Sequence, residues 1–366
     1  MKQVCLLCER TSLNHNLYCQ ETYCPAEMSP NMLEPGEWLG DIEIVRPVIV
    51  LRSSVLYEAI QQKRRLFLKV AHPGTHHKER LKREAEFLRD IQLANRQDKY
   101  LPVLLPSYVN QSLNKKTEPY GKIMLGGHLL YFFLFTHCEG EPLRDLLMKN
   151  PQLWLNHIGL MTISVANAIA FLHSKGKFHF GLSPEAVLVH FDEKENVPRV
   201  LLFDLGIMSD AQGMKSDWYN EFVAPAYLAP EFVSASSVRL DYRTDVYGIG
   251  LLLYELLVGE PAVPFKLRSD AEIYRLVLDS IQRIPMSRRE DVPELAEIAV
   301  KAVQPQQSNR QESARALIKE LRKFFGSVPD EKASRWPSLQ TMLVIIGALL
   351  AVAFLFTLVV VSTRLF

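Results

Sequence analysis

The sequence has almost no net charge and shows no internal repeat or low-complexity stretch. Its 366 residues carry 42 lysines and arginines against 41 aspartates and glutamates, a formal net charge of +1. A general nucleic-acid-binding protein would show a basic excess or stripe, so we expect no nucleic-acid partner. A content of 48% hydrophobic residues also excludes disordered and collagen-like chains, because so many apolar side chains can form a core.

Cysteine is scarce over most of the chain, which excludes a secreted scaffold held by disulfides. Four of the five cysteines lie near the N-terminus: Cys5, Cys8, Cys19 and Cys24. The spacing is C-x2-C, ten residues, then C-x4-C, and four thiolates can surround zinc tetrahedrally. A segment this short would fold on the metal rather than on a core of its own. The pattern predicts a structural zinc ribbon over residues 1–28; two disulfides or unrelated thiols are the alternatives.

An N-terminal signal peptide is not recognisable, whereas the C-terminus carries a long uncharged run. Residues 342–361 are 20 consecutive residues without a charge. As a helix they would span about 30 Å, the thickness of a bilayer core, which a buried core helix seldom reaches. We therefore expect a juxtamembrane linker at 327–338 and a single transmembrane helix at 339–362. The preceding domain is expected on the cytoplasmic side of the cell membrane, with protein partners that the sequence does not name.

Residues 40–326 read as one block with strands first and helices later, after a linker rich in proline at 29–39. We expect strands at 42–51, 54–59, 65–71 and 131–135, with a charged helix at 75–95 between the last two. Further helices are expected at 154–174, 245–259, 269–281, 293–302 and 313–325. A small sheet lobe followed by a larger helical lobe indicates an α+β fold.

Short motifs stand along this block in a fixed order. They are LFLK at 66–69, REA at 83–85, FTHCEG at 135–140, HFGLSPEAVL at 179–188, FDLG at 203–206, APE at 229–231 and DVYG at 245–248. The set resembles the eukaryotic-type serine/threonine protein kinase family, in a bacterial rather than an animal style. The resemblance implies a two-lobed kinase-like fold. It also implies that Lys69 pairs with Glu84 and contacts phosphate, that Asp204 binds magnesium, and that Arg310 pairs with Glu231.

The segment that resembles the catalytic loop lacks the polar groups of the family. Gly181 replaces the aspartate that acts as base, Ser183 replaces the lysine at the γ-phosphate, and Ala186 replaces the asparagine that holds the second magnesium. These substitutions predict no catalytic residue and a membrane-anchored pseudokinase, a binding or scaffolding module in signalling. The alternative is an active serine/threonine kinase with a non-standard loop. A third possibility is a zinc-ribbon adaptor whose kinase-like body is a spacer.

The nucleotide-binding groups are only partly present. The glycine positions of the phosphate-binding loop fall on Ile49, Leu51 and Ser54, whose side chains would obstruct the approach of phosphate. Lys69, Glu84 and Asp204 remain, as a residual site for ATP and magnesium or as a structural ion pair. Phe67, two residues before Lys69, shares its face of the strand, where the family has a small residue above adenine. With Phe135 nearby we expect it to fill that space, so that ATP does not bind; the alternative is that Phe67 turns into the core of the small lobe.

Two other groups of reactive side chains are expected to have no catalytic or metal-binding role. His72, His76 and His77 cluster near a turn with no acidic or cysteine residue in metal-ligand spacing, so we expect them to face solvent. Cys138 is a single thiol in the hinge-like segment, and we expect it to pack against its neighbours.

Overall fold

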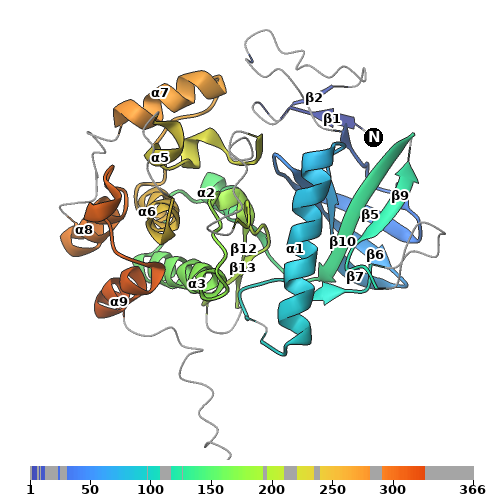
Figure 1. Cartoon of the computed structure of the whole chain (residues 1–366), viewed down its shortest axis with the longest axis horizontal. Helices are drawn as coiled ribbons and strands as arrows, with labels where there is room; N and C mark the ends of the chain where they lie inside the picture. The colour runs from blue at the N-terminus through green and yellow to red at the C-terminus, as the bar shows by residue number, and fades with distance from the viewer. Residues whose placement is uncertain are drawn as a thin grey trace, which may run out of the picture. The chain divides into compact units, whose positions relative to one another are not determined.

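A computed structural model describes residues 2–5, 8, 10–12, 24, 31–96, 98–107, 117–125, 127–192, 196–209, 221–234, 240–280 and 291–325. In this part of the chain a sheet-rich lobe with one long helix stands beside a larger helical lobe (Figure 1). The two-lobed α+β prediction is therefore confirmed. The predicted juxtamembrane linker at 327–338 and transmembrane helix at 339–362 lie outside the described residues.

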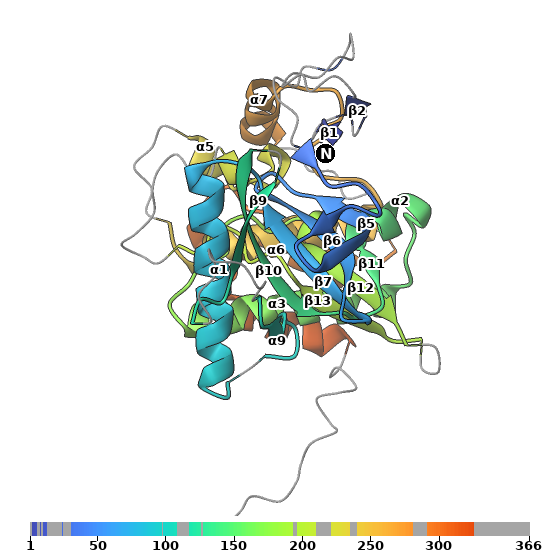
Figure 2. The ribbon, with the colours of Figure 1, turned by 90° about the vertical axis from the view of Figure 1, so that its right-hand side faces the viewer.

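The small lobe is an antiparallel sheet in the order β4-β5-β6-β7-β10-β8, with β9 also paired to β10. The strands are β4 (Trp38–Leu39), β5 (Ile42–Val50), β6 (Ser54–Gln61), β7 (Arg64–Ala71), β8 (Leu104–Leu105), β9 (Gly121–Leu125) and β10 (His128–Thr136). Helix α1 (Thr75–Leu93) packs against β7 and β10 (Figure 2). Its buried Leu81, Ala85 and Leu88 recur at helical spacing, which explains why this charged segment docks by one face.

The other face of this sheet packs against the N-terminal segment. Strands β1 (Lys2–Val4), β2 (Thr11–Ser12) and β3 (Asn31–Met32) form a small sheet in the order β2-β1-β3. Val4, Met32 and Leu33 belong to one apolar cluster with β5, β6, β7 and β10, and the Leu33 N–H donates to Tyr57 Oη at 2.9 Å. The interpretation of residues 29–39 as a linker is therefore wrong in part, because β3 and β4 lie within them and are paired.

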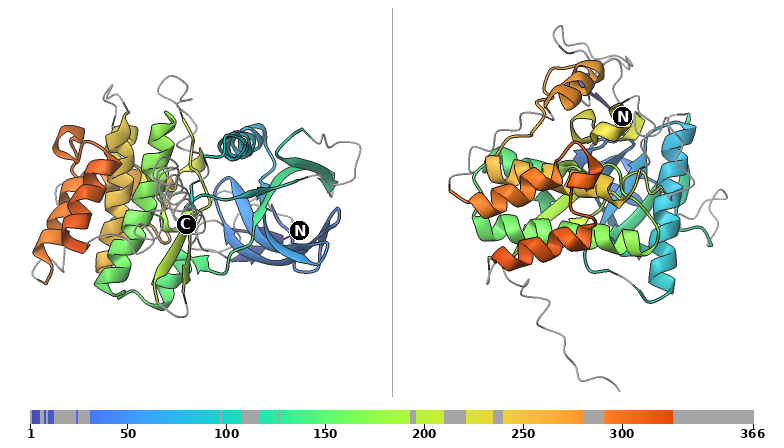
Figure 3. Two further views of the ribbon diagram at one scale, coloured as in Figure 1. Left: turned by 90° about the horizontal axis from the view of Figure 1, so that it is seen from below. Right: turned by 60° about the vertical axis from the view of Figure 1, so that its left-hand side comes forward.

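The large lobe is built around two buried helices, α3 (Leu155–Ser174) and α6 (Tyr242–Val258), which pack against each other and against α9 (Figure 3). The remaining helices are α2 (Leu143–Lys149), α5 (Pro230–Val233), α7 (Asp270–Ser280), α8 (Pro293–Ala302) and α9 (Ala314–Phe325), with 3-10 turns η1 (Pro184–Ala186), η2 (Pro225–Tyr227) and η3 (Gln307–Asn309). Among the described residues α3 alone is long and apolar enough to cross a membrane, and its burial marks it as a core helix.

A short sheet and two buried acidic side chains position the loops between the lobes. The sheet runs β11 (Glu141–Pro142), β12 (Val187–Phe191), β13 (Pro198–Leu202). On α6, Asp245 accepts hydrogen bonds from the backbone N–H of His179 and of Phe180, at 2.9 and 2.7 Å. Glu231 receives two hydrogen bonds of 2.8 Å from Arg310, which confirms that predicted pair.

Candidate functional site

The structure brings together the three residues predicted as a residual nucleotide site. Lys69 lies on β7 and Glu84 on α1, and Lys69 Nζ donates to the two Glu84 oxygens at 2.8 and 2.6 Å. The same Nζ reaches Asp204 Oδ1, just beyond β13, at 2.5 Å. Lys69 and Glu84 are 0% and 1% exposed, so this is a buried ion pair rather than a surface one.

Asp204 has a second cationic partner that the sequence analysis missed. Arg80 Nη2 donates to both carboxylate oxygens of Asp204 at 2.8 Å. Burial by itself would raise the pKa of Asp204, but Arg80 and Lys69 outweigh it and hold that pKa well below its usual range. A signal was present, because Arg80 precedes Glu84 by four residues and so lies on the same face of α1.

The loop in the place of the catalytic loop is held by backbone contacts. The Gly181 N–H donates to His179 Nδ1 at 3.2 Å, and His179 Nε2–H donates to the Asp204 carbonyl at 2.8 Å. A Cβ added at Gly181 would lie 3.0 Å from a methyl of Val223, so the loop leaves little space for a larger residue. Ala186 is buried with only a methyl group as its side chain. Neither Gly181 nor Ala186 offers a side-chain oxygen for a proton or a metal.

The hairpin in the place of the phosphate-binding loop is closed by ordinary β-sheet bonds. Ile49 pairs with Leu56 across β5 and β6, and the Leu51 N–H donates to the Ser54 carbonyl at 2.8 Å. At the tip, Arg52 forms a bidentate ion pair with Asp270 at the start of α7, at 2.7 and 2.8 Å. The Leu51 N–H is thus already used within the hairpin, and the tip is tied to the large lobe.

Phe67 lies on the cleft side of the small-lobe sheet. It is 1% exposed, its ring lies 5.2 Å from that of Phe135 and 4.8 Å from that of His137, and it is absent from the cluster on the opposite face. The ring is thus fully buried on the face of the sheet that carries Lys69, and not in the cluster on the opposite face. Burial raises the pKa of the neighbouring Cys138 thiol to about 11, consistent with a packed and unreactive side chain.

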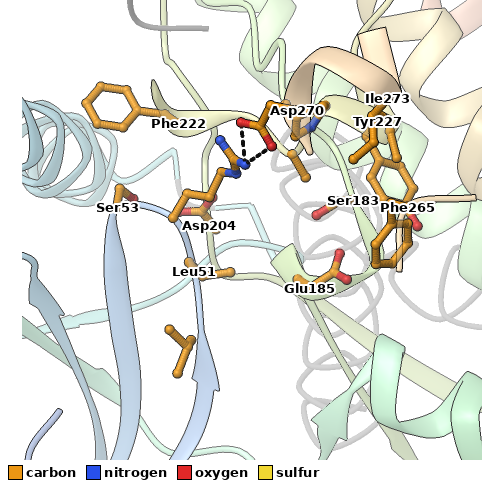
Figure 4. Close-up of a pocket in the computed structure, with 16 residues that line it drawn as sticks. Leu51, Ser53, Ser183, Glu185, Asp204, Phe222, Tyr227, Phe265, Asp270 and Ile273 are labelled. Carbon is orange, nitrogen blue, oxygen red and sulfur yellow. Dashed lines mark hydrogen bonds and ion pairs between the residues drawn. The ribbon is translucent and has the colours of Figure 1, made fainter. Parts of the chain in front are cut away.

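The open part of the cleft is a pocket of about 110 Å³ between the hairpin and α7 (Figure 4). Its lining joins the two lobes: Val50, Leu51, Arg52, Ser53, Gly181, Ser183, Glu185, Asp204, Phe222, Ala224, Pro225, Ala226, Tyr227, Phe265, Asp270 and Ile273. Phe67 and Phe135 do not line it, so the pocket stops short of these two rings. Polar groups from Ser183 and Glu185 point toward the aromatic rings of Tyr227 and Phe265.

In this arrangement the site does not fit a magnesium nucleotide. Both oxygens of Asp204 already accept hydrogen bonds from cations, and Ala186 contributes no second ligand. The ring of Phe67 is packed beside Phe135 at the position where the family resemblance implies a small residue above adenine. Lys69 is bound to two carboxylates rather than turned toward a phosphate.

Three of the four predicted zinc ligands lie together. The sulfur atoms of Cys5, Cys8 and Cys24 are within 4.8 Å of one another, while Cys19 lies outside the described residues. Cys5 Sγ and Cys24 Sγ are 3.5 Å apart, and none of the three is in a disulfide. Four sulfurs about 2.3 Å from a zinc ion would be about 3.8 Å from one another, so this thiol set fits zinc.

The three clustered histidines do not all face solvent, and for two of them that prediction is wrong. His72 and His77 are buried, with His72 Nε2–H donating to the Leu51 carbonyl at 2.7 Å. Burial lowers the pKa of each to about 4. His76 is more exposed, and its Nδ1 lies 2.7 Å from Glu221 Oε2. The sequence near the histidines does not indicate these contacts, because the partners Leu51 and Glu221 lie elsewhere in the chain.

Comparison with known proteins agrees with this architecture. The protein kinase domain matches residues 117–327. The serine/threonine-protein kinase PkaA of Streptomyces coelicolor is 35% identical over 148 residues, 40% of this chain and 26% of that protein. A probable serine/threonine-protein kinase of Clostridium acetobutylicum is 26% identical over 192 residues, 52% of this chain and 28% of that protein. The chain thus spans under a third of these curated relatives.

A solved structure extends the likeness to both lobes. The PknI kinase domain of Mycobacterium tuberculosis superimposes with a TM-score of 0.50 at 18% sequence identity, covering 81% of this chain and 100% of that one. At this identity the likeness concerns the fold. Because the family match extends over more than half of the sequence and both lobes share the fold, the chain belongs to the protein kinase domain family.

Proposed function

We propose that this kinase-fold protein transfers no phosphate and acts as a binding or scaffolding module in signalling. The observation that carries the proposal is the state of Asp204, whose two oxygens are bound by Arg80 and Lys69. Phosphoryl transfer needs this carboxylate to hold metal, and it needs a base and a second metal ligand at positions that are Gly181 and Ala186 here.

The same proposal assigns roles to the two ends of the chain. Cys5, Cys8, Cys19 and Cys24 would hold a structural zinc ion that supplies folding energy to the N-terminal segment. That segment would then present a rigid surface, because Val4 and Met32 pack on the small-lobe sheet. Residues 339–362 would anchor the protein in the cell membrane with the kinase-like domain in the cytoplasm.

A second candidate is an active serine/threonine kinase. It is favoured by the names of the relatives, which are serine/threonine-protein kinases, and by the intact Lys69–Glu84 pair. On this reading Arg80 would have to release Asp204, and Phe67 would have to leave the cleft. Glu185, which lines the same pocket as Gly181, would be the side chain to examine as a substitute base.

Phosphate transfer by this 366-residue chain in detergent separates the two candidates. We expect no incorporation from radiolabelled ATP above background with magnesium or manganese, into the protein itself or into generic substrates. The control is Lys69→Met, which removes the amine that an active kinase would need at the phosphates and leaves any contaminating kinase unaffected. Incorporation that the unaltered chain shows and Lys69→Met loses would establish the active kinase.

A further inference from the structure

Four buried charges meet between α1 and the loop after β13. They are Lys69, Arg80, Glu84 and Asp204, with exposed fractions of 0%, 3%, 1% and 7%. Two are cations and two are anions, so the cluster is neutral as it stands, and removing any single one of them leaves a net charge. Lys69 contacts both carboxylates, whereas Arg80 forms its ion pair with Asp204.

Arg80 connects four parts of the molecule. From α1 its Nη2 donates to both Asp204 oxygens at 2.8 Å, and its Nη1 donates to Ser53 Oγ at the tip of the hairpin. Its guanidinium also lies over the ring of Phe222, with 5.7 Å to the centroid. The planar guanidinium directs Nη2 at the carboxylate of Asp204 and Nη1 at Ser53 at the same time, which gives the contact both charge and direction.

We infer that Arg80 is a built-in cation that takes the place of magnesium at Asp204 and keeps the lobes closed without nucleotide. The inference rests on the proposed function in that Asp204 no longer has to bind metal. In a working site a metal ion arrives with the nucleotide and leaves with the product. A guanidinium on α1 stays, so the closed arrangement becomes a permanent state of the fold.

The charges of the cluster make this inference testable. Removing the Arg80 guanidinium leaves two buried carboxylates with the single cation Lys69, an excess of one negative charge. A buried charge without a partner is strongly unfavourable, whereas removing both partners of a pair together costs much less. A divalent cation would then be drawn to the vacated side of Asp204, since carboxylate oxygen is the ligand that magnesium and manganese prefer.

A double-mutant cycle of Arg80→Met, Asp204→Asn and the two together, made in this chain in detergent, measures the coupling. We expect Arg80→Met to lower the unfolding temperature by about 5 °C or more. The double variant Arg80→Met with Asp204→Asn should unfold at a higher temperature than Arg80→Met alone. Arg89→Met is the matched control, because Arg89 is on the same helix but pairs with Asp90 at the surface, and it should change little. Additive losses in the double variant would overturn the inference.

Titration with magnesium or manganese chloride, read by thermal unfolding, tests whether Arg80 takes the place of a metal ion at Asp204. We expect no shift in the unaltered protein and a rise of about 2 °C or more in Arg80→Met that disappears when Asp204→Asn is added. Equal shifts in the unaltered protein and the variant, or none in either, would contradict it. If Arg80→Met does not fold, Arg80→Lys takes its place, because it keeps the charge but not the planar guanidinium. Arg80→Lys should fold, and the metal should raise its unfolding temperature by a smaller amount. Phosphate transfer by the unaltered chain would refute the proposed function and leave this coupling measurable.

Discussion

Arg52 and Asp270 form a bidentate ion pair between the lobes although 218 positions separate them in the chain. Arg52 is at the tip of the β5–β6 hairpin and Asp270 is the first residue of α7, and both line the cleft pocket. Asp270 is labelled in Figure 4. Their side chains are 24% and 39% exposed, so solvent screens the pair. The tip of the hairpin is therefore held by two contacts, that of Arg52 with Asp270 and that of Ser53 with Arg80.

Arg52→Ala should loosen the hairpin without unfolding the protein. We expect a loss of about 0.5–1 kcal/mol in the free energy of unfolding, because a partly exposed pair contributes little. Hydrogen exchange of residues 50–55 should become faster, and the same effect should follow from Asp270→Asn. Arg65→Ala is the control, since Arg65 is more exposed and its partner Glu58 is in the small lobe. Unchanged exchange in both variants would show that the pair does not restrain the hairpin.

Phe67→Ala should create affinity for ATP where the unaltered protein has none at millimolar concentration. The substitution removes the ring that fills the adenine position and leaves a cavity there, at a cost of about 3–5 kcal/mol in stability. Calorimetry with ATP measures the gain. Phe132→Ala is the matched control, because Phe132 is equally buried but belongs to the cluster on the opposite face of the sheet. Micromolar affinity in the unaltered protein would contradict the prediction.

Elemental analysis should find one zinc ion per chain, bound by the four N-terminal cysteines. Cys19→Ser should lower the zinc content and, because the metal stabilises the segment that packs on the small-lobe sheet, the unfolding temperature as well. Cys138→Ser serves as control, since this cysteine lies in the hinge-like segment. Full zinc content after Cys19→Ser would show that the four-cysteine site is wrong.

Stability should fall in mild acid because His72 and His77 are buried in their neutral form. The pKa of each is lowered by burial from its ordinary 6.5 to about 4. Between these values the unfolded chain takes up protons that the folded chain does not. Their contribution is therefore fully present above about pH 6.5 and falls by up to about 1.4 kcal/mol per pH unit for each histidine as pH decreases toward 4. Urea unfolding at pH 7.5, 6.5 and 5.5 measures the slope, which His72→Gln should reduce and His76→Gln should not.

The full chain should fractionate with membranes and resist extraction by alkaline carbonate, whereas residues 1–335 should be soluble. The reason is the run of 20 uncharged residues at 342–361, whose length matches the hydrocarbon core. Replacing two leucines of the run, Leu349 and Leu350, by arginine should release the chain from the membrane fraction. Recovery of the unaltered chain without detergent would contradict the prediction.

Local pattern was sufficient for most of the elements and for the family. The strands at β5, β6 and β7 and the helices α1, α3 and α8 were predicted within a few residues, because the periods of strands and helices are visible in the chain itself. The order of short motifs likewise identified the lobes and the Lys69–Glu84 and Glu231–Arg310 pairs. The short strands β3 and β4 were missed because residues 29–39 carry proline and glycine, and only pairing with β1 and β5 makes them strands.

The state of the site was decided by contacts between residues far apart in the chain. Gly181 and Ala186 show in sequence that a base and a metal ligand are missing, since a missing functional group is a property of the residue itself. That Arg80 binds Asp204, that Arg52 reaches Asp270, and that His72 and His77 are buried depends on which surfaces fold against each other. From the sequence alone a charged side chain is expected to face water. The reason is that the sequence does not show whether folding will bring a buried counter-ion against it.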